Sequence, residues 1–345
     1  MISKIPVFNS ATAWQQSLKN GFRNVNELLR FLNLSVEQIS PAPDPDANFP
    51  LRVPRSYAER ITKGNAEDPL LLQILPVDIE NNRIPGFVAD PVGDHAALVG
   101  NGLVKKYAGR ALLITTGACA IHCRYCFRRH FPYATANGNL DQWQSAIEFI
   151  RQDESISEVI LSGGDPLLME NEYLSRLTNQ LKPIPHIKRV RIHTRIPVVL
   201  PDRIDQAFIA WLSELPFNTS IVIHCNHANE IDALVGKTLL KLARTNATIF
   251  NQSVLLHRIN DSVEALSSLS ERLFESRVIP YYLHLLDKVQ GAAHFDVSRD
   301  KALEIMHELR QRLPGYLTPR LVKEKAGAAC KIPLFSTSDH YPEFE

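Results

Sequence analysis

The sequence has little of several features that would point to a function class. The chain has 38 Lys and Arg against 37 Asp and Glu. It therefore lacks the excess of positive charge that would favour binding to nucleic acid or to an anionic membrane. No apolar run reaches the roughly 18 residues that a transmembrane helix requires, and the stretch MISKIPVFNSATAWQQ lacks the apolar core of a signal peptide. Five cysteines in 345 residues do not form a disulfide framework. We therefore expect a cytoplasmic protein with reduced thiols and without nucleic-acid or membrane partners.

What the chain does contain is the composition of an ordinary globular protein, 45% hydrophobic and 22% charged. Residues 1–100 predict a mostly helical and irregular extension. Residues 26–32 have helical apolar spacing, and Ser35 with Gln38 matches a capping box. Prolines between 41 and 54 predict a connector on the surface.

From residue 110 onward, short apolar runs alternate with helical patterns. The six predicted strands cover residues 111–115, 158–162, 190–194, 220–224, 248–254 and 279–284. The predicted helices cover residues 140–151, 171–181, 204–214, 235–244, 262–277 and 299–313. This alternation predicts an α/β fold with a parallel sheet and crossover helices, either an open doubly wound sheet or a full or partial barrel. In each of these folds the chemistry belongs at the carboxyl ends of the strands.

The strongest motif is Cys119-Ala-Ile-His-Cys123-Arg-Tyr-Cys126, directly after the first predicted strand. Three thiolates in one loop can ligate three irons of a [4Fe–4S] cluster and leave the fourth iron open. A structural zinc site would usually require a fourth ligand at matching spacing, and no second cysteine pair clearly supplies it. Three incidental or buried thiols are the remaining alternative.

This loop resembles the CxxxCxxC signature of the radical S-adenosylmethionine (SAM) enzymes. The resemblance implies that Cys119, Cys123 and Cys126 are the metal ligands of a [4Fe–4S] cluster, and that Tyr125 packs near the adenine of SAM. With six predicted strands rather than eight, it implies a partial (β/α)6 TIM-like barrel of the radical SAM type.

A second motif, Ser162-Gly-Gly-Asp-Pro166, follows the second predicted strand. Glycines there allow a ligand to approach the backbone, and Asp165 offers a carboxylate to a ligand amine. By itself the motif is a turn. After a three-cysteine loop it resembles the family's motif for the SAM amino group, which implies cofactor contacts for Gly163, Gly164 and Asp165. Arg195, after the third strand, matches a contact to the SAM carboxylate, with an ordinary ion pair as the alternative.

Three further stretches resemble lysine 2,3-aminomutases, which combine SAM with pyridoxal 5'-phosphate (PLP). They are Cys126-Phe-Arg-Arg-His-Phe, Pro280-Tyr-Tyr-Leu-His-Leu-Leu-Asp287 and Gly327-Ala-Ala-Cys-Lys331-Ile-Pro, together with strings such as Pro197-Val-Val-Leu-Pro and Asn251-Gln-Ser-Val-Leu-Leu. The similarity covers roughly residues 100 to 335. We therefore divide the chain into an amino-terminal extension (1–100), a radical SAM barrel (101–320) and a carboxyl-terminal segment that carries the PLP lysine (321–345).

By position, Lys331 matches the catalytic lysine that carries PLP as a Schiff base, which only a lysine side chain can form. Lys106, Arg110 and Gln252 match positions that contact PLP, and the basic pair would suit its phosphate. The aminomutases carry a run of glycines before this lysine, whereas this chain has Gly327-Ala-Ala-Cys330. We expect that loop to be less permissive.

The resemblance also implies how the substrate binds. Arg128 matches the bidentate partner of the amino-acid carboxylate. Asp287 and Glu324 match two carboxylates that bind the distal ammonium of lysine, and Glu324 replaces an aspartate, which lengthens the arm. For each of these charged residues a solvated surface position is the alternative.

Together these features predict an isomerase that converts L-α-lysine to (R)-β-lysine. The chain ends soon after Lys331, which resembles the branch associated with modification of elongation factor P. That branch implies a reducing electron donor such as flavodoxin or ferredoxin, and a separate ligase that attaches β-lysine to the factor. The alternatives are an aminomutase for another amino acid, such as glutamate, and a non-catalytic iron–sulfur protein. The oligomeric state, a homo-oligomer included, stays open.

The string Ile223-His-Cys-Asn-His227 looks like a metal cluster, but strand alternation sends neighbouring side chains to opposite faces. We predict instead that His224 and Asn226 line the pocket, and that Cys225 and Cys330 are structural thiols.

Overall fold

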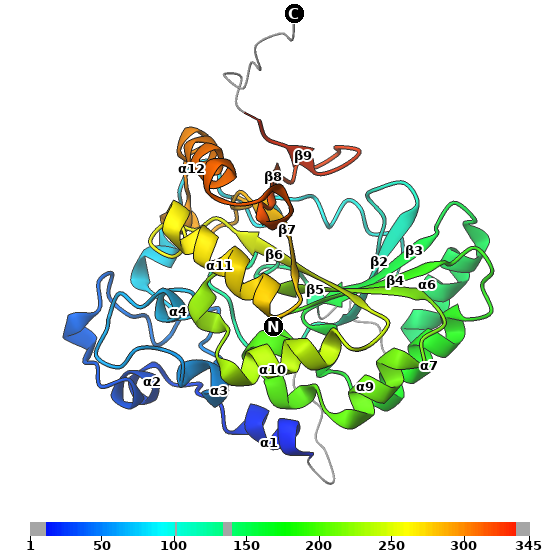
Figure 1. Cartoon of the computed structure of the whole chain (residues 1–345), viewed down its shortest axis with the longest axis horizontal. Helices are drawn as coiled ribbons and strands as arrows, with labels where there is room; N and C mark the ends of the chain where they lie inside the picture. Colours follow the sequence, from blue (N-terminus) through cyan, green and yellow to red (C-terminus); the bar gives the residue numbers. More distant parts are fainter. Residues whose placement is uncertain (1–11, 101, 134–139, 336–345) are drawn as a thin grey trace, which may run out of the picture.

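A computed structural model of the chain describes residues 12–100, 102–133 and 140–335. Its centre is a nine-stranded sheet in which each strand lies beside its neighbour in sequence, from β1 to β9 (Figure 1). The strands are β1 Leu103–Val104, β2 Arg110–Thr116, β3 Glu158–Gly163, β4 Arg189–Thr194, β5 Asn218–His224, β6 Thr248–Val254, β7 Ile279–His284, β8 Arg320–Lys323 and β9 Ile332–Pro333. The linear order leaves β1 and β9 as two edges, so the fold is a partial barrel, as predicted.

The strands from β2 to β8 run parallel, and only the edge pairs β1–β2 and β8–β9 are antiparallel. The six strands predicted from the sequence are confirmed as β2 to β7. The further parallel strand β8 was not predicted because its four residues, Arg-Leu-Val-Lys, have exposed charges at both ends and a buried pair between them. The observed sheet therefore extends one parallel strand beyond the prediction.

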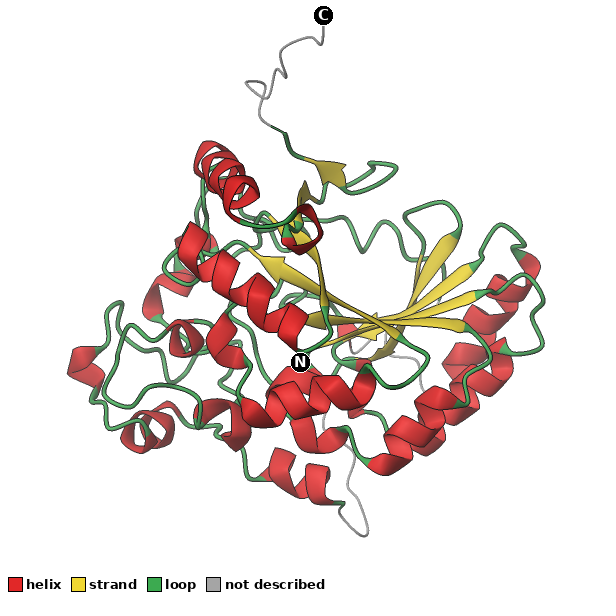
Figure 2. Cartoon of the chain, in the orientation of Figure 1, coloured by secondary structure: helices red, strands yellow, loops and turns green. Residues whose placement is uncertain are grey.

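The crossover helices are α6 Leu140–Gln152, α7 Asn171–Leu181, α9 Gln206–Ser213, α10 Ala233–Leu242, α11 Val263–Glu275 and α12 Arg299–Arg312. All six lie where the sequence predicts them. Side chains at several N-caps explain the starting points: Asp205 accepts from the backbone N–H of Phe208, and Ser262 from that of Ala265. Figure 2 shows the red helices packed along the yellow sheet.

The amino-terminal extension carries the short elements α1 Ala13–Lys19, α2 Val25–Phe31, η1 Val36–Gln38, α3 Arg55–Ala58, α4 Pro69–Leu72 and η2 Asp78–Asn81. The predicted capping box is present, since Gln38 Oε1 accepts from the Ser35 N–H at 2.8 Å. The extension packs onto the barrel through one shared apolar core that includes Leu28, Tyr57 and Leu161. Within the described residues, no helix has the length and apolar character needed to cross a membrane.

Candidate active site

A cavity of about 690 Å³ opens at the carboxyl ends of the parallel strands and extends over the inner face of the sheet. It is lined by every residue to which the sequence analysis gives a cluster, cofactor or substrate contact: Lys106, Arg110, Cys119, Cys123, Tyr125, Cys126, Arg128, Gly163, Gly164, Asp165, Arg195, Gln252, Asp287, Glu324 and Lys331. Residues far apart in the sequence thus share one enclosed space. Their individual roles stay predictions.

The cysteine loop follows β2 and is held by the amino-terminal extension. The backbone N–H of His122 donates to Arg52 O at 3.0 Å, and Arg52 Nη1 donates to Cys119 O at 3.1 Å. The His122 ring contacts Pro50 O at 2.7 Å. The amino-terminal extension therefore forms a wall beside the cysteine loop and sets the shape of that loop.

A buried ion-pair cluster reinforces this wall. Arg124 donates from Nε and Nη2 to the two Glu80 carboxylate oxygens at 2.8 and 2.5 Å, and Arg129 Nη2 reaches one of them at 2.5 Å. Burial opposes ionisation of Glu80, but the two guanidiniums hold its pKa below the usual range. The sequence analysis did not find Glu80, although the arginines that flank Cys126 were a usable signal.

Burial favours the protonated form of two of the three thiols, Cys119 and Cys126. Burial raises the pKa of Cys119 well above its ordinary value and that of Cys126 to about 11. A buried thiolate is stable only when it is ligated or paired, so Cys119 and Cys126 would release their protons if they bound a metal group. Their side chains belong to the described part of the chain, where no three His, Cys, Asp or Glu are placed to hold a single metal ion.

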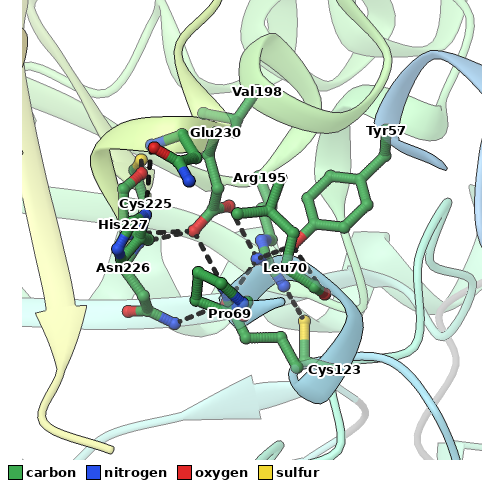
Figure 3. A network of polar contacts seen from close by, with 12 residues as sticks. Tyr57, Pro69, Leu70, Cys123, Arg195, Val198, Cys225, Asn226, His227 and Glu230 are labelled. Atoms are coloured by element: carbon green, nitrogen blue, oxygen red, sulfur yellow. Dashed lines mark hydrogen bonds and ion pairs between the residues drawn. The ribbon is translucent and has the colours of Figure 1, made fainter. Parts of the chain in front are cut away.

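Arg195 joins the loop to a network of buried polar groups (Figure 3). Its Nη1 donates to Cys123 Sγ at 2.7 Å, and its Nη2 donates to Glu230 Oε2 and Gln73 Oε1, both at 2.8 Å. The ion-pair alternative stated for Arg195 is thus present, but it is buried rather than superficial. Its Nε is buried and has no hydrogen-bond partner among the described residues.

The same network corrects the prediction for Asn226. Asn226 does not line the cavity; its amide donates to Gln73 Oε1 at 3.0 Å and accepts from the Val254 N–H at 2.9 Å. The prediction was wrong because Glu230, fully buried four residues later, accepts from the Asn226 N–H and draws this turn into the wall. His224 lines the cavity as predicted.

The two glycines of the second motif allow β3 to end against the cysteine loop. Gly163 has φ +118°, and a Cβ there would lie 2.5 Å from Thr116 O. A Cβ on Gly164 would lie 2.2 Å from Ala118 O. Both contacts are with backbone that cannot move aside, so glycine is required at both positions.

We expect Gly164→Ala to destabilise the protein by about 3 kcal/mol or more, because the added methyl group forces β3 away from the cysteine loop. Thermal unfolding should show the loss, and iron binding should fall with it. Gly236→Ala is the matched control, since its Cβ would meet only Ser276 Oγ at 3.7 Å. Equal melting temperatures for the two variants would contradict this account.

In this structure the Asp165 carboxylate is occupied by hydrogen bonds from the protein itself. Its carboxylate accepts from Thr194 Oγ1 and the Arg195 N–H, both at 2.7 Å, and from the Leu167 N–H at 3.1 Å. Burial raises its pKa to about 6 despite these bonds. Asp165 therefore links the ends of β3 and β4, and its contact with a SAM amine stays a prediction.

On the other side of the cavity, charges alternate along a chain of contacts. Arg128 Nε donates to Asp94 Oδ2 at 2.7 Å, and Lys106 Nζ lies 2.5 Å from Asp94 Oδ1 and 3.7 Å from Glu324 Oε1. Glu324 also pairs with Lys331. Arg128, predicted to bind the substrate, and Lys106 and Lys331, predicted to bind PLP, thus share the carboxylates of Asp94 and Glu324. The sequence analysis did not find Asp94.

Asp287 differs from these paired acids. It lines the cavity, and its side chain makes no hydrogen bond to the described residues. Burial and the charge of Glu324 raise its pKa to about 7, while Lys331 and Lys106 act in the opposite direction. Its role toward a substrate ammonium stays a prediction.

The floor of the cavity offers unsatisfied hydrogen-bonding nitrogens. The Nε2 atoms of His193 and His284 and the Nε of Arg110 are buried and have no hydrogen-bond partner in the described part of the chain. Burial lowers the pKa of both histidines. Lys106 and Lys331 place positive charge in the same space. These residues fit an anionic, hydrogen-bonding group of the size and chemistry of PLP.

The two remaining cysteines lie in different environments. Cys225 is fully buried, as expected of a structural thiol. Cys330 is exposed and borders the cavity beside Lys331, so its prediction as a structural thiol is wrong. The open turn at Gly327, with φ +77°, brings this segment to the surface.

Comparison with known proteins relates the chain to one superfamily and to several enzymes. Residues 113–272 match the Radical SAM superfamily. The chain is 46% identical to L-lysine 2,3-aminomutase of Escherichia coli (strain K12), over 93% of this chain and 94% of that protein. The identity to the enzyme of Haemophilus influenzae is 44%, over 93% of this chain and 95% of that protein. The identity to the enzyme of Clostridium subterminale is 32%, over 93% of this chain and 77% of that protein. A radical SAM methyltransferase structure from Sphaerobacter thermophilus aligns with a TM-score of 0.43 and 16% identity, covering 64% of this chain and 68% of that one.

Proposed function

Because this chain belongs to the L-lysine 2,3-aminomutase family of radical SAM isomerases, we propose that it converts L-α-lysine to (R)-β-lysine with the help of PLP. One observation carries the proposal. A single cavity holds three cysteines, a lysine amine and charged groups that suit both ends of a lysine molecule.

Different residues of the cavity would hold the iron–sulfur cluster, PLP and SAM. Cys119, Cys123 and Cys126 would hold the [4Fe–4S] cluster, and the Lys331 amine would hold PLP, with its phosphate near Lys106 and Arg110 and with Gln252 beside it. The SAM contacts would come from Tyr125, Gly163, Gly164, Asp165 and Arg195. When bound, the cluster and SAM supply a hydrogen-abstracting radical, and PLP supplies a conjugated ring that delocalises unpaired spin.

The chain's own residues orient the substrate. Arg128 presents a guanidinium to the amino-acid carboxylate, and Asp287 with Glu324 presents negative charge to the distal ammonium. Glu324 pairs with Lys331 here, so its carboxylate would be shared between the Lys331 amine and the substrate ammonium. Since the walls enclose the reacting atoms, they exclude water and radical quenchers.

The direct test is anaerobic incubation of the reconstituted protein with lysine, SAM, PLP and a reductant. Chromatography should show β-lysine, and omission of PLP should remove it. Glutamate in place of lysine should give no β-isomer, because the acidic pair at Asp287 and Glu324 repels a second carboxylate. Absence of β-lysine from a protein with a full cluster and PLP would overturn the proposal.

Asp287 should impose a pH dependence on lysine use. Its carboxyl has a pKa of about 7 in the free protein, so it is neutral below that pH and negative above it. We expect kcat/KM for lysine to rise through about pH 7, because only the ionised form attracts the substrate ammonium. Asp287→Asn should remove this rise and lower kcat/KM by about 30-fold or more. A wild-type pH profile in Asp287→Asn would contradict the assignment.

We further propose that the protein works in the cytoplasm and takes electrons from a flavodoxin or ferredoxin. By the resemblance to its branch, its product is then attached to elongation factor P by a separate ligase. Mass spectrometry of elongation factor P from cells that lack this protein should show the loss of the β-lysyl group. An unchanged mass would remove this part of the proposal.

A further inference from the structure

Asp94 lies outside every helix and strand, in the loop that leads from the amino-terminal extension to β1. The loop is shaped by Asp90, whose carboxylate accepts from the backbone N–H groups of Asp94 and His95, both at 3.0 Å. Gly93 has φ +69° and packs against Ala326 of the carboxyl-terminal segment. This loop buries the Asp94 carboxylate in the cavity wall.

Both oxygens of that carboxylate are used. Oδ2 accepts from Arg128 Nε at 2.7 Å, and Oδ1 lies 2.5 Å from Lys106 Nζ. Burial opposes ionisation, but Arg128 and Lys106 hold the pKa of Asp94 below its usual range. Asp94 is thus a fixed negative charge between two cations that the proposed function assigns to the substrate carboxylate and the cofactor phosphate.

The contacts leave Arg128 with a defined free edge. Its Nε is taken by Asp94, and one N–H of Nη1 donates to Ser162 Oγ at 3.1 Å. A guanidinium can receive a carboxylate either along its Nε–Nη side or across its two Nη atoms. With the first edge blocked at Nε, a bidentate carboxylate is left with Nη2, which has no hydrogen-bond partner among the described residues, and with the second N–H of Nη1.

Lys106 is oriented by the same carboxylate. Its Nζ also donates to Val92 O at 2.7 Å, and Glu324 Oε1 lies farther away at 3.7 Å. Without Asp94, two buried cations would lose their shared counter-charge, and Lys106 would be drawn to Glu324. Glu324 is one of the two acids assigned to the substrate ammonium, so both ends of the site depend on Asp94.

We propose that Asp94 is a positioning residue, which makes Arg128 bind the substrate carboxylate end-on and holds Lys106 ready for the cofactor phosphate. The inference rests on the proposed function of these two cations. It adds a residue that touches neither substrate nor cofactor and acts through its neighbours.

The test compares Asp94→Asn with the wild-type holoenzyme. Asn keeps the volume but removes the charge, so KM for lysine should rise about 10–100-fold, while kcat and iron content change little. The PLP concentration needed for half-saturation should rise as well. Asp94→Glu, which keeps the charge, should lie between Asn and wild type. Asp153→Asn is the matched control, because Asp153 pairs with the neighbouring Lys105 outside the cavity and its loss should leave KM unchanged.

Lysinamide, which lacks the carboxylate, separates positioning from a general structural role. Calorimetry on the holoprotein should show that Asp94→Asn weakens lysine binding much more than lysinamide binding, because only lysine has the carboxylate that Arg128 binds. Equal weakening of both ligands, or an unchanged lysine affinity, would overturn the inference. Because these are binding measurements, they decide the role of Asp94 even if the wild-type protein forms no β-lysine. Absence of β-lysine would count against the proposed function alone.

Discussion

Cys126→Ala should lose the [4Fe–4S] cluster and all β-lysine formation. The three cysteines come from one loop, and the structure places no fourth cysteine beside them, since Cys225 is buried away from the cavity and Cys330 lies beside Lys331. With one thiolate removed, the remaining two cannot hold three irons, so the catalytic radical cannot form. Iron and sulfide analysis, visible absorbance and electron paramagnetic resonance after reconstitution measure the effect.

Cys225→Ala is the matched control for this experiment. It removes a fully buried thiol that does not line the cavity, so it should bind iron and sulfide as the wild type does, with a modest loss of thermal stability. A full cluster in Cys126→Ala, or an equal loss in Cys225→Ala, would contradict the ligand assignment.

Lys331→Ala should abolish PLP attachment and activity while the cluster stays intact. The Lys331 amine lies in the cavity against Glu324 and 6.0 Å from the ring centre of Tyr282, in the space with unsatisfied nitrogens for an anionic group. No other side chain type forms the covalent bond to PLP. After borohydride reduction, peptide mass spectrometry should find a pyridoxyl group on Lys331 of the wild type and none in the variant.

Lys325→Ala provides the comparison from the same segment. Lys325 is exposed and does not line the cavity, so its loss should change neither trapping nor turnover. A pyridoxyl group on another lysine, or β-lysine formed by Lys331→Ala, would show that the cofactor is held elsewhere. Iron content equal to that of the wild type in both variants excludes damage to the cysteine loop as the cause.

Much of the fold could be predicted because strand and helix periodicity are local. The runs that became β2 to β7 are apolar and bounded by turns, whereas β8 has only two buried residues and was missed. Cys330 was misjudged for a related reason: exposure depends on how the turn at Gly327 leaves the sheet, which residue type does not reveal.

The sequence analysis did not predict the buried acids. Glu80, Asp94 and Glu230 lie in polar turns that resemble solvated loops, yet each is buried against an arginine from another part of the chain. Burying a carboxylate is favourable only with such a partner. The partner of Glu230, Arg195, is 35 residues away, and that of Asp94, Arg128, is 34 residues away.

The sequence by itself determined the three-cysteine loop and the alternation of β2 to β7 with their helices, because spacing along a covalent chain and periodicity along an element are local properties. The resemblance to the aminomutases indicated the other side chains of the site. Only the tertiary structure decided how those side chains are paired: Arg195 with Glu230 and Cys123, and Arg128 with Lys106 through Asp94. Pairing depends on which loops the fold brings together and on the burial that makes an unpaired charge costly. The near-neutral total charge of the chain reveals nothing of this arrangement.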